Sequence, residues 1–264
     1  ALSATQGSVA LITNKSTLNI DNAQIGVIED GVNYGNRVLA NNANVMGGVI
    51  SVTNGKLNIS NSQFIGNYAQ TNEQYSARGG AIYVGDDAEV TITNSKFESN
   101  YASSGSTSNQ TFGGAIFMAG KSLTIKAEDN GDTTFRDNYY QTGTNKQKND
   151  IVVLSRYSTI DSNPVVRLIA ESGYIYLYDT IQGVNASYKN SNENQFKLIL
   201  GGTSNGEINI AGIYGANVQV NGDVDNMKIV IGTTSGSNPI SAQYSNIKAN
   251  SGVWSFSGEI SNGG

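Results

Sequence analysis

Three short acidic clusters are the residues of this sequence that could most directly do chemistry. They are Glu29–Asp30, Asp86–Asp87, and Glu128–Asp129 with Asp132 and Asp137. Enzymes that cleave polysaccharides use clustered carboxylates as general acid and base, with a Lys or Arg nearby. The clusters therefore raise the hypothesis of a carbohydrate-active enzyme.

The acidic clusters also have structural explanations. Asp86–Asp87 stands between a Gly-Gly motif and the next strand, where turn geometry alone favours Asp. The spacing from Glu128 to Asp137 differs from that of an EF-hand, so it gives only weak grounds for a calcium site. We therefore expect no catalytic residue, no metal site and no cofactor.

The amino-acid composition removes several other classes of protein. The 264 residues include neither His nor Cys, which excludes Ser-His-Asp and Cys-His catalysis, thiol redox chemistry and a zinc site. A net charge of −5 with only 16 basic residues argues against nucleic-acid binding. No apolar run reaches the roughly 18 residues of a membrane-spanning helix. The first residues also lack the pattern of a signal peptide.

The same composition favours β-strands. The chain has 25 Ile and 19 Val against 11 Leu, and β-branched residues are enriched in strands. It also has 34 Asn and 31 Gly, the residues that most readily adopt the left-handed backbone of tight corners. No convincing stretch shows a helical period, so we expect short strands broken by Gly and Asn.

Two tetrapeptides recur in order through the first half of the chain. Gly-Gly-Ala-Ile, or Gly-Gly-Val-Ile at its first occurrence at 47–50, precedes an alternating strand, and Phe-x-x-Asn follows that strand. The positions that define the repeat are Gly79, Gly80, Ala81, Ile82, Gly113, Gly114, Ala115 and Ile116, with Phe64, Asn67, Phe97, Asn100, Phe135 and Asn138. One such unit cannot bury its own apolar face, but stacked units share a continuous core.

The repeat predicts an all-β, right-handed parallel β-helix, which is a solenoid. We expect one domain over 1–264, with regular repeats at 17–140 and degenerate coils at 141–264. Equivalent residues should lie above one another, so Asn22, Asn61 and Asn94 should form one ladder and Asn67, Asn100 and Asn138 another. At about 20 residues per coil, each repeat would be longer than one coil.

We assign the surplus residues to loops on one edge of the solenoid. The segments 31–46, 70–78, 103–112 and 141–149 are polar and occupy matching positions. Insertions on one face of a repeat protein often form its binding face, although tolerated surface variation explains them equally well. Tyr75, Arg78 and Asn109 are the candidate binding residues in these loops.

A second candidate is a row of tyrosines in the other half of the chain. Tyr174, Tyr176 and Tyr178 alternate with Ile175 and Leu177, so the three rings should share the outer face if the aliphatic residues point inward. Such a row would bind sugar by stacking. The strand propensity of tyrosine is the simpler explanation.

The two tetrapeptides in register resemble the repeats of chlamydial polymorphic membrane proteins and related autotransporter adhesins. The segments 79–82, 97–100 and 113–116 carry the resemblance most clearly, and it covers 17–140. The segment 169–183 resembles the coils that follow such repeats in many autotransporter passengers. Chlamydial members tend to contain Cys and this chain has none, so we assign it to the wider autotransporter group.

The resemblance implies a secreted passenger domain displayed on the Gram-negative outer membrane through a translocator barrel absent from this chain. Its expected role is that of a cell-surface adhesin, in attachment to host cells or extracellular matrix or in bacterial aggregation and biofilm formation, and thus in virulence. The implied partners are a host surface glycan, glycoprotein or matrix protein, or self-association between bacteria. We expect this sequence to be a piece of a larger protein. Two alternatives remain: a β-helix polysaccharide lyase or hydrolase, and a passive stalk for a distal binding tip.

Overall fold

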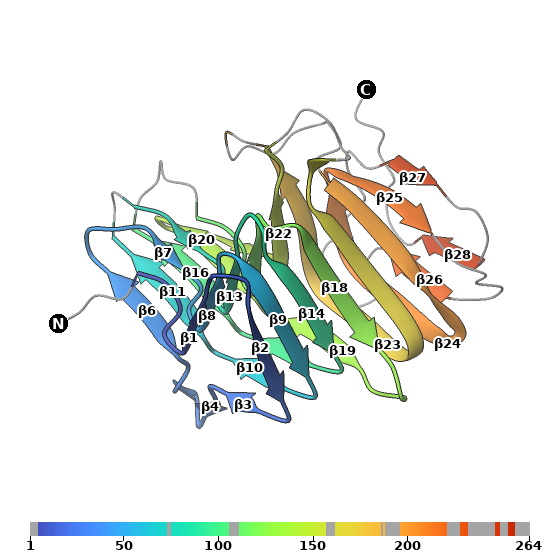
Figure 1. The fold of residues 1–264 in the computed structure, drawn as a ribbon, viewed down its shortest axis with the longest axis horizontal. Helices are drawn as coiled ribbons and strands as arrows, with labels where there is room; N and C mark the ends of the chain where they lie inside the picture. Colours follow the sequence, from blue (N-terminus) through green and yellow to red (C-terminus); the bar gives the residue numbers. More distant parts are fainter. Residues whose placement is uncertain are drawn as a thin grey trace.

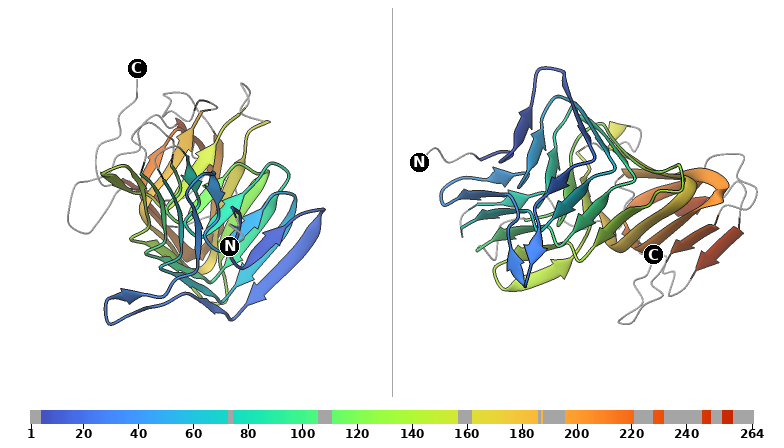
Figure 2. Two further views of the ribbon diagram at one scale, coloured as in Figure 1. Left: turned by 90° about the vertical axis from the view of Figure 1, so that its left-hand side faces the viewer. Right: turned by 90° about the horizontal axis from the view of Figure 1, so that it is seen from below.

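The chain is a stack of coils in which each coil lies against the previous one through parallel strands. The structure is a computed structural model, and it describes residues 5–72, 75–105, 111–156, 162–185, 187, 196–220, 228–231, 246–248 and 253–256. Strands of successive coils run side by side along the long axis in Figure 1, and the left panel of Figure 2 looks along the stack. The fold is all-β and is a parallel β-helix, which confirms the predicted fold class.

The strands of the coils lie on three faces of the β-helix. Face 1 contains β2 (Ser16–Asp21), β9 (Gly55–Ser60), β14 (Glu89–Thr93), β18 (Ser122–Ala127), the first parts of β23 (Val165–Val184) and β24 (Phe196–Tyr214), β25 (Ala216–Val220) and β27 (Asn246–Lys248). Face 2 contains β3 (Gln24–Ile25), β10 (Gln63–Ile65), β15 (Lys96–Glu98), β19 (Thr133–Arg136), the middle parts of β23 and β24, β26 (Lys228–Ile231) and β28 (Val253–Phe256). Face 3 contains β1 (Ala10–Ile12), β8 (Ile50–Val52), β13 (Ile82–Val84), β17 (Ile116–Met118), β22 (Ile151–Leu154) and the last parts of β23 and β24.

The repeat of the first half is itself one coil. Phe64 pairs with Phe97 and Asn67 with Asn100, which are 33 residues apart, so consecutive repeats are direct neighbours in the stack. The expectation of about 20 residues per coil is therefore wrong for this half. It is close only near the C-terminal end, where the bonded Glu207 and Lys228 are 21 residues apart. Because the coils of this half are longer than about 20 residues, the β-helix has fewer coils than a coil of about 20 residues would give.

The corners of the coils use residues in the left-handed region. Asn22, Asn61 and Asn94 have φ of 50°, 49° and 47°, so these three residues turn the chain from face 1 to face 2. At the corner before face 3, Gly79 has φ of 72°, and a Cβ on Gly80 would lie 2.1 Å from the carbonyl oxygen of Gly114. The Gly-Gly pair is thus required once for backbone conformation and once for space.

The interior of the β-helix is a continuous apolar core. Leu57, Val90 and Leu123 occupy equivalent inward positions on face 1, and all three are buried. On face 2 the rings of Phe64, Phe97 and Phe135 stack at centroid distances of 4.7 Å, and the three side chains are fully buried. The Phe of each repeat is therefore a core position.

A side sheet covers face 3 in the first half of the chain. It consists of the parallel strands β6 (Arg37–Ala40), β11 (Tyr68–Thr71), β16 (Tyr101–Ser104) and β20 (Tyr139–Thr142), with the antiparallel β21 (Asn145–Lys148) at its edge. A second apolar core lies beneath it, where Ala69 and Ala102 pack with Tyr83, Phe117 and other residues that point outward from face 3. Two further pairs of short strands complete the fold: β7 (Val45–Met46) with β12 (Ala77–Arg78), and the hairpin of β4 (Ile28–Glu29) and β5 (Val32–Asn33).

The Asn of each Phe-x-x-Asn motif forms a buried hydrogen-bonded column. Asn67 Nδ2 donates to Asn100 Oδ1 and Asn100 Nδ2 donates to Asn138 Oδ1, both over 3.0 Å, which confirms this predicted ladder. The corner ladder is only partly as predicted. Asn61 and Asn94 share a conformation, but their amides donate to Asp21 Oδ1 and to the carbonyl of Glu128 instead of to each other.

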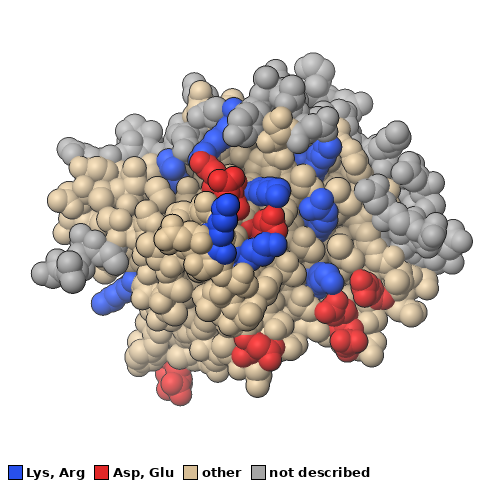
Figure 3. Space-filling view, in the orientation of Figure 1, with Lys and Arg blue, Asp and Glu red and all other residues tan. Residues whose placement is uncertain are grey.

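The surface is sparsely charged. Figure 3 shows that most of the side facing the viewer is neither acidic nor basic, with Lys and Arg gathered near its middle. Within the described part of the chain, no helix has the length and apolar character needed to cross a membrane.

Candidate functional site

The outer face of the side sheet carries two columns of side chains that repeat from coil to coil. Strand alternation turns Ala69 and Ala102 inward and leaves their neighbours outward. The first column is Arg37, Tyr68, Tyr101 and Tyr139, and the second is Leu39, Gln70, Ser103 and Gln141. Because the strands are parallel and in register, equivalent groups lie one strand spacing apart, about 4.8 Å.

The tyrosines of the first column stack on one another. The centroids of Tyr68 and Tyr101 are 4.7 Å apart and those of Tyr101 and Tyr139 are 5.0 Å apart, with nearly parallel planes. Arg37 Nη1 donates to the Tyr68 hydroxyl over 3.0 Å, and Lys146 Nζ lies 3.5 Å from the centroid of Tyr139. Burial raises the pKa of Tyr101 and Tyr139, so both hydroxyls stay protonated at neutral pH. Since the ring faces cover one another, the column offers edges and hydroxyls to a ligand.

A groove of ≈ 480 Å³ runs beside the second column, at the edge where the strands of the side sheet end. It is lined by Leu39, Ala40, Asn41, Gln70, Thr71, Asn72, Ser103, Ser104, Gly105, Gln141 and Gly143. The hydroxyls of Thr71 and Ser104 donate inward, to the carbonyl of Ala43 and to that of Tyr75. The described lining is uncharged and rich in amides and hydroxyls, which suits hydrogen bonding to a neutral polar ligand.

The groove lies at segments that the sequence predicts to be loops, but parts of those segments form strands. The segments 31–46, 70–78, 103–112 and 141–149 contribute strands or strand ends to the side sheet and its neighbours. The prediction that they are surplus loops is therefore wrong for the parts that form strands. The strands of the side sheet are short, and their inward residues include the small Ala69 and Ala102. The alternation of apolar and polar residues is therefore weak in the sequence and does not predict strands there.

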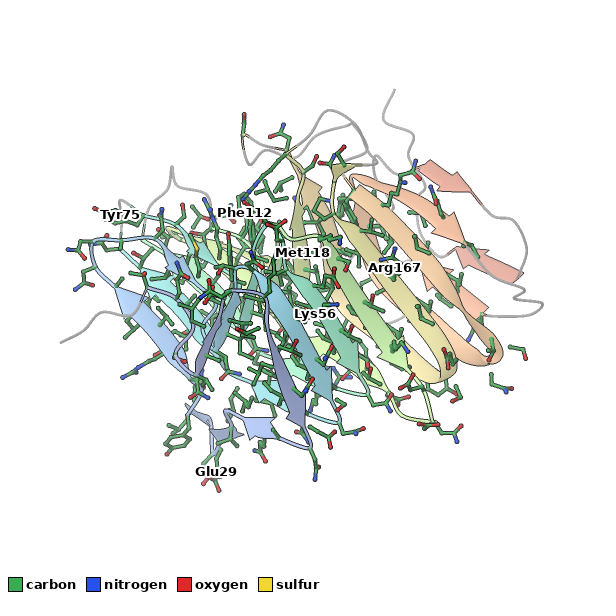
Figure 4. All side chains as sticks on the ribbon, viewed as in Figure 1. Glu29, Lys56, Tyr75, Phe112, Met118 and Arg167 are labelled. Atoms are coloured by element: carbon green, nitrogen blue, oxygen red, sulfur yellow. The ribbon has the colours of Figure 1, made fainter. Side chains whose placement is uncertain are left out.

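The candidate residues of these segments lie at different depths. Tyr75 is half-buried close to the groove, and Figure 4 shows it near the edge of the molecule. Arg78 belongs to β12, and its guanidinium lies 5.6 Å from the centroid of Phe117, so its position is set by packing over the second core. Asn109 lies outside the described residues.

The tyrosine row is on a different sheet from the groove. Ile175 and Leu177 are buried, so Tyr174, Tyr176 and Tyr178 point outward from β23, as their alternation predicts. Their rings are 5.6 and 5.5 Å apart, and Arg136 lies 4.3 Å from the centroid of Tyr178. These contacts leave less free ring surface for sugar stacking than three separate tyrosines would. The structure does not bring this row together with Tyr75 and Arg78.

The acidic clusters are distributed over several parts of the surface. Asp86 forms an ion pair with Arg156 beside a depression of ≈ 360 Å³ that Asp87 and Lys121 also line. Glu128 pairs with Lys126 at 3.2 Å, and Asp132 Oδ1 accepts a hydrogen bond from the Tyr174 N–H. Among the residues that the structure describes, no three acidic side chains are grouped to hold a metal ion.

A buried pair of carboxyl groups was not predicted from the sequence. Asp150 and Asp179 are 0% and 3% exposed, and Asp150 Oδ2 accepts the Asp179 N–H over 3.0 Å. Burial raises the pKa of Asp150, and it raises that of Asp179 to about 6. Asp150 follows an Asn within a polar segment and Asp179 follows the tyrosine row, so no local pattern connects them. They meet only in the folded protein, where Asp150 accepts hydrogen bonds from the Asn138 side-chain amide and from the Asp179 backbone N–H.

The chain is thus a parallel β-helix with a groove beside a column of uncharged side chains that continues from coil to coil. No protein-family model matches the chain, and neither the curated proteins nor the solved structures contain a significant match to it.

Proposed function

We propose that this chain is a non-enzymatic adhesin passenger fragment on a bacterial cell surface. The groove on the side sheet is the observation that supports binding over catalysis, because its described lining offers amides and hydroxyls and no carboxylate pair for proton transfer. The repeat resemblance supports display on a Gram-negative outer membrane. The ligand class is a host surface glycan, glycoprotein or matrix protein, or another copy of the protein in bacterial aggregation and biofilm formation.

Binding at the groove is tested with a glycan and extracellular-matrix array, run beside an aggregation assay on cells that display the protein. Replacing Gln70 and Ser103 by Ala removes two outward polar groups of the second column without touching the core. We expect weaker array binding or weaker aggregation with unchanged thermal stability. Gln63→Ala is the matched control, since Gln63 is an exposed amide on face 2. Equal loss in the control would contradict a site at the groove.

A carbohydrate-active enzyme is the second candidate, and it rests on the depression lined by Asp86, Asp87, Lys121 and Arg156. Carboxylates with basic groups are the catalytic set of polysaccharide lyases and hydrolases. Turnover of an acidic polysaccharide that is lost in Asp86→Ala would support the enzyme and end the adhesin-only proposal. A passive stalk is the third candidate: failure of the folded fragment to block adhesion at high concentration would support it.

A further inference from the structure

We propose that face 1 of the β-helix binds a sulfated or carboxylated polysaccharide, at a surface separate from the groove. The outward positions of β9, β14, β18 and the first parts of β23 and β24 form the basic face. Its charged residues are Lys56, Glu89, Lys126, Arg167 and Lys197, with Lys121 directly before β18. Glu89 is the one acidic side chain at these outward strand positions, and Glu128, directly after β18, pairs with Lys126 at 3.2 Å. The positive excess of the face therefore comes from Lys56, Lys121, Arg167 and Lys197, although the whole chain has a net charge of −5. The positive excess is visible near the middle of Figure 3.

The basic groups are spread across several coils. Lys56 is on β9 and Lys197 is on β24, and Figure 4 shows Lys56 and Arg167 on the same side of the molecule. Three strands lie between these two end strands, so four strand spacings separate them and the basic face extends over about 19 Å. Lys126 and Arg167 lie diagonally on the adjacent strands β18 and β23. This spacing suits an extended polyanion better than a single small anion.

Glu89 shows that the lysines of this face can hold an anionic group jointly. Its carboxylate lies 3.3 Å from Lys56 Nζ and 3.1 Å from Lys121 Nζ, so it bridges lysines from the coils on either side of its own. The two lysines lower the pKa of Glu89. Their side chains are 61% and 70% exposed, so both remain accessible. A carboxylate or sulfate of a ligand would compete with Glu89 for the same pair.

The rest of the basic face favours a polysaccharide over other polyanions. Asn58, Thr91 and Thr124 lie in register beside Arg167 and provide neutral hydrogen-bonding groups for hydroxyls. Proteins that bind single-stranded nucleic acid use aromatic residues on which the bases stack, and the outward positions of the basic face hold none. The exposed large hydrophobic residues that would insert into a membrane lie elsewhere on the described surface.

The test measures heparin binding to the whole chain by calorimetry at low and at physiological salt. We expect binding that weakens with salt. Arg167→Gln or Lys126→Gln should each weaken it by about two- to five-fold, the range of one exposed charge pair. Glu89→Gln should strengthen it by a similar factor, because it frees Lys56 and Lys121. This opposite sign separates a defined site from loss of folding.

Controls of equal charge change come from face 2. Lys96→Gln and Glu207→Gln alter the net charge by the same amounts, in ion pairs away from the basic face, and should leave heparin affinity unchanged. Absence of heparin binding at low salt, or equal effects of these controls, would overturn the proposal. So would equally tight binding to single-stranded DNA or to anionic phospholipid vesicles. The result is independent of the groove variants, so failure of the adhesin proposal would be recognised separately.

Discussion

Asn138 Nδ2 donates a hydrogen bond to Asp150 Oδ1 over 2.8 Å, and this contact joins the asparagine column to a buried carboxyl pair. In earlier coils each column amide donates to the next Asn, as Asn100 does to Asn138. At this coil the side sheet ends, and Asp150 takes the place of the next Asn, with Asp179 donating its backbone N–H to the same carboxyl group. A charge-bearing pair therefore terminates a neutral ladder inside the protein.

The first prediction concerns pH. Burial raises the pKa of Asp179 to about 6 and also raises that of Asp150, while Lys148 Nζ lies 3.9 Å from Asp179 and Asp137 adds a nearby negative charge. The folded state therefore binds more protons than the unfolded state between about pH 4 and pH 6. We expect the contribution of Asp179 to lower the free energy of unfolding as pH rises through this range, by on the order of 2 kcal/mol, and the raised pKa of Asp150 to add a decrease of the same sign.

The assignment is checked by urea unfolding at pH 4.5, 5.5 and 7 on the Asp179→Asn variant. We expect a flatter pH profile and a higher stability than the parent at pH 7. Asp86→Asn is the control, because the Asp86 side chain is 65% exposed and distant from the pair in sequence and fold. An unchanged pH profile in Asp179→Asn would assign the dependence to other groups.

The second prediction concerns the asparagine column. Asn100→Ala removes a buried amide that bonds to Asn67, Asn138 and the carbonyl of Phe64. Its neighbours then have buried polar atoms without partners, so we expect a loss of about 3 kcal/mol in unfolding free energy. Asn58→Ala removes only an exposed bond to Asn19 and should cost less than about 1 kcal/mol. Equal effects in a denaturant titration would contradict the structural role of the column.

The third prediction concerns the stacked phenylalanines. Phe97 is fully buried between Phe64 and Phe135, so Phe97→Ala should cost about 3–5 kcal/mol through the cavity it leaves. Tyr101→Phe, in the column on the surface of the side sheet, removes one hydroxyl and should change stability by less than about 1 kcal/mol. Thermal unfolding monitored by circular dichroism distinguishes the two. A small effect of Phe97→Ala would mean that the core relaxes around the vacancy.

The fourth prediction concerns the Gly-Gly corner. A methyl group on Gly80 would lie 2.1 Å from the Gly114 carbonyl oxygen and 2.4 Å from the Tyr101 nitrogen. Both are backbone atoms, so they can give way only if the neighbouring strands move. We expect Gly80→Ala to impair folding, seen as loss of soluble protein or of the cooperative transition. Gly31→Ala has no atom within 4 Å and only a left-handed φ of 77°, so it should cost about 1 kcal/mol. Normal stability of Gly80→Ala would show that the coils can separate locally.

The sequence predicted the repeat-borne parts of the fold because neighbouring coils repeat the same residues. Phe64, Phe97 and Phe135 recur in register, and their stacking follows from a parallel β-helix without further information. The side sheet was missed because its inward residues are small, as at Ala69 and Ala102, and its outward residues are polar. The groove was missed with it, although its edge coincides with the segments expected to carry binding residues.

The sequence by itself determined the strand composition, the corners at Asn61 and Asn94, and the stacking of consecutive units. These depend on local backbone preference and on alternation, which each repeat carries within itself. The tertiary structure decided that one repeat makes one coil, and that Asp150 and Asp179 share a buried site. It also gathered the lysines around Glu89 on one face. Such relationships join residues from different coils, and the distance between coils is set only when the strands pair.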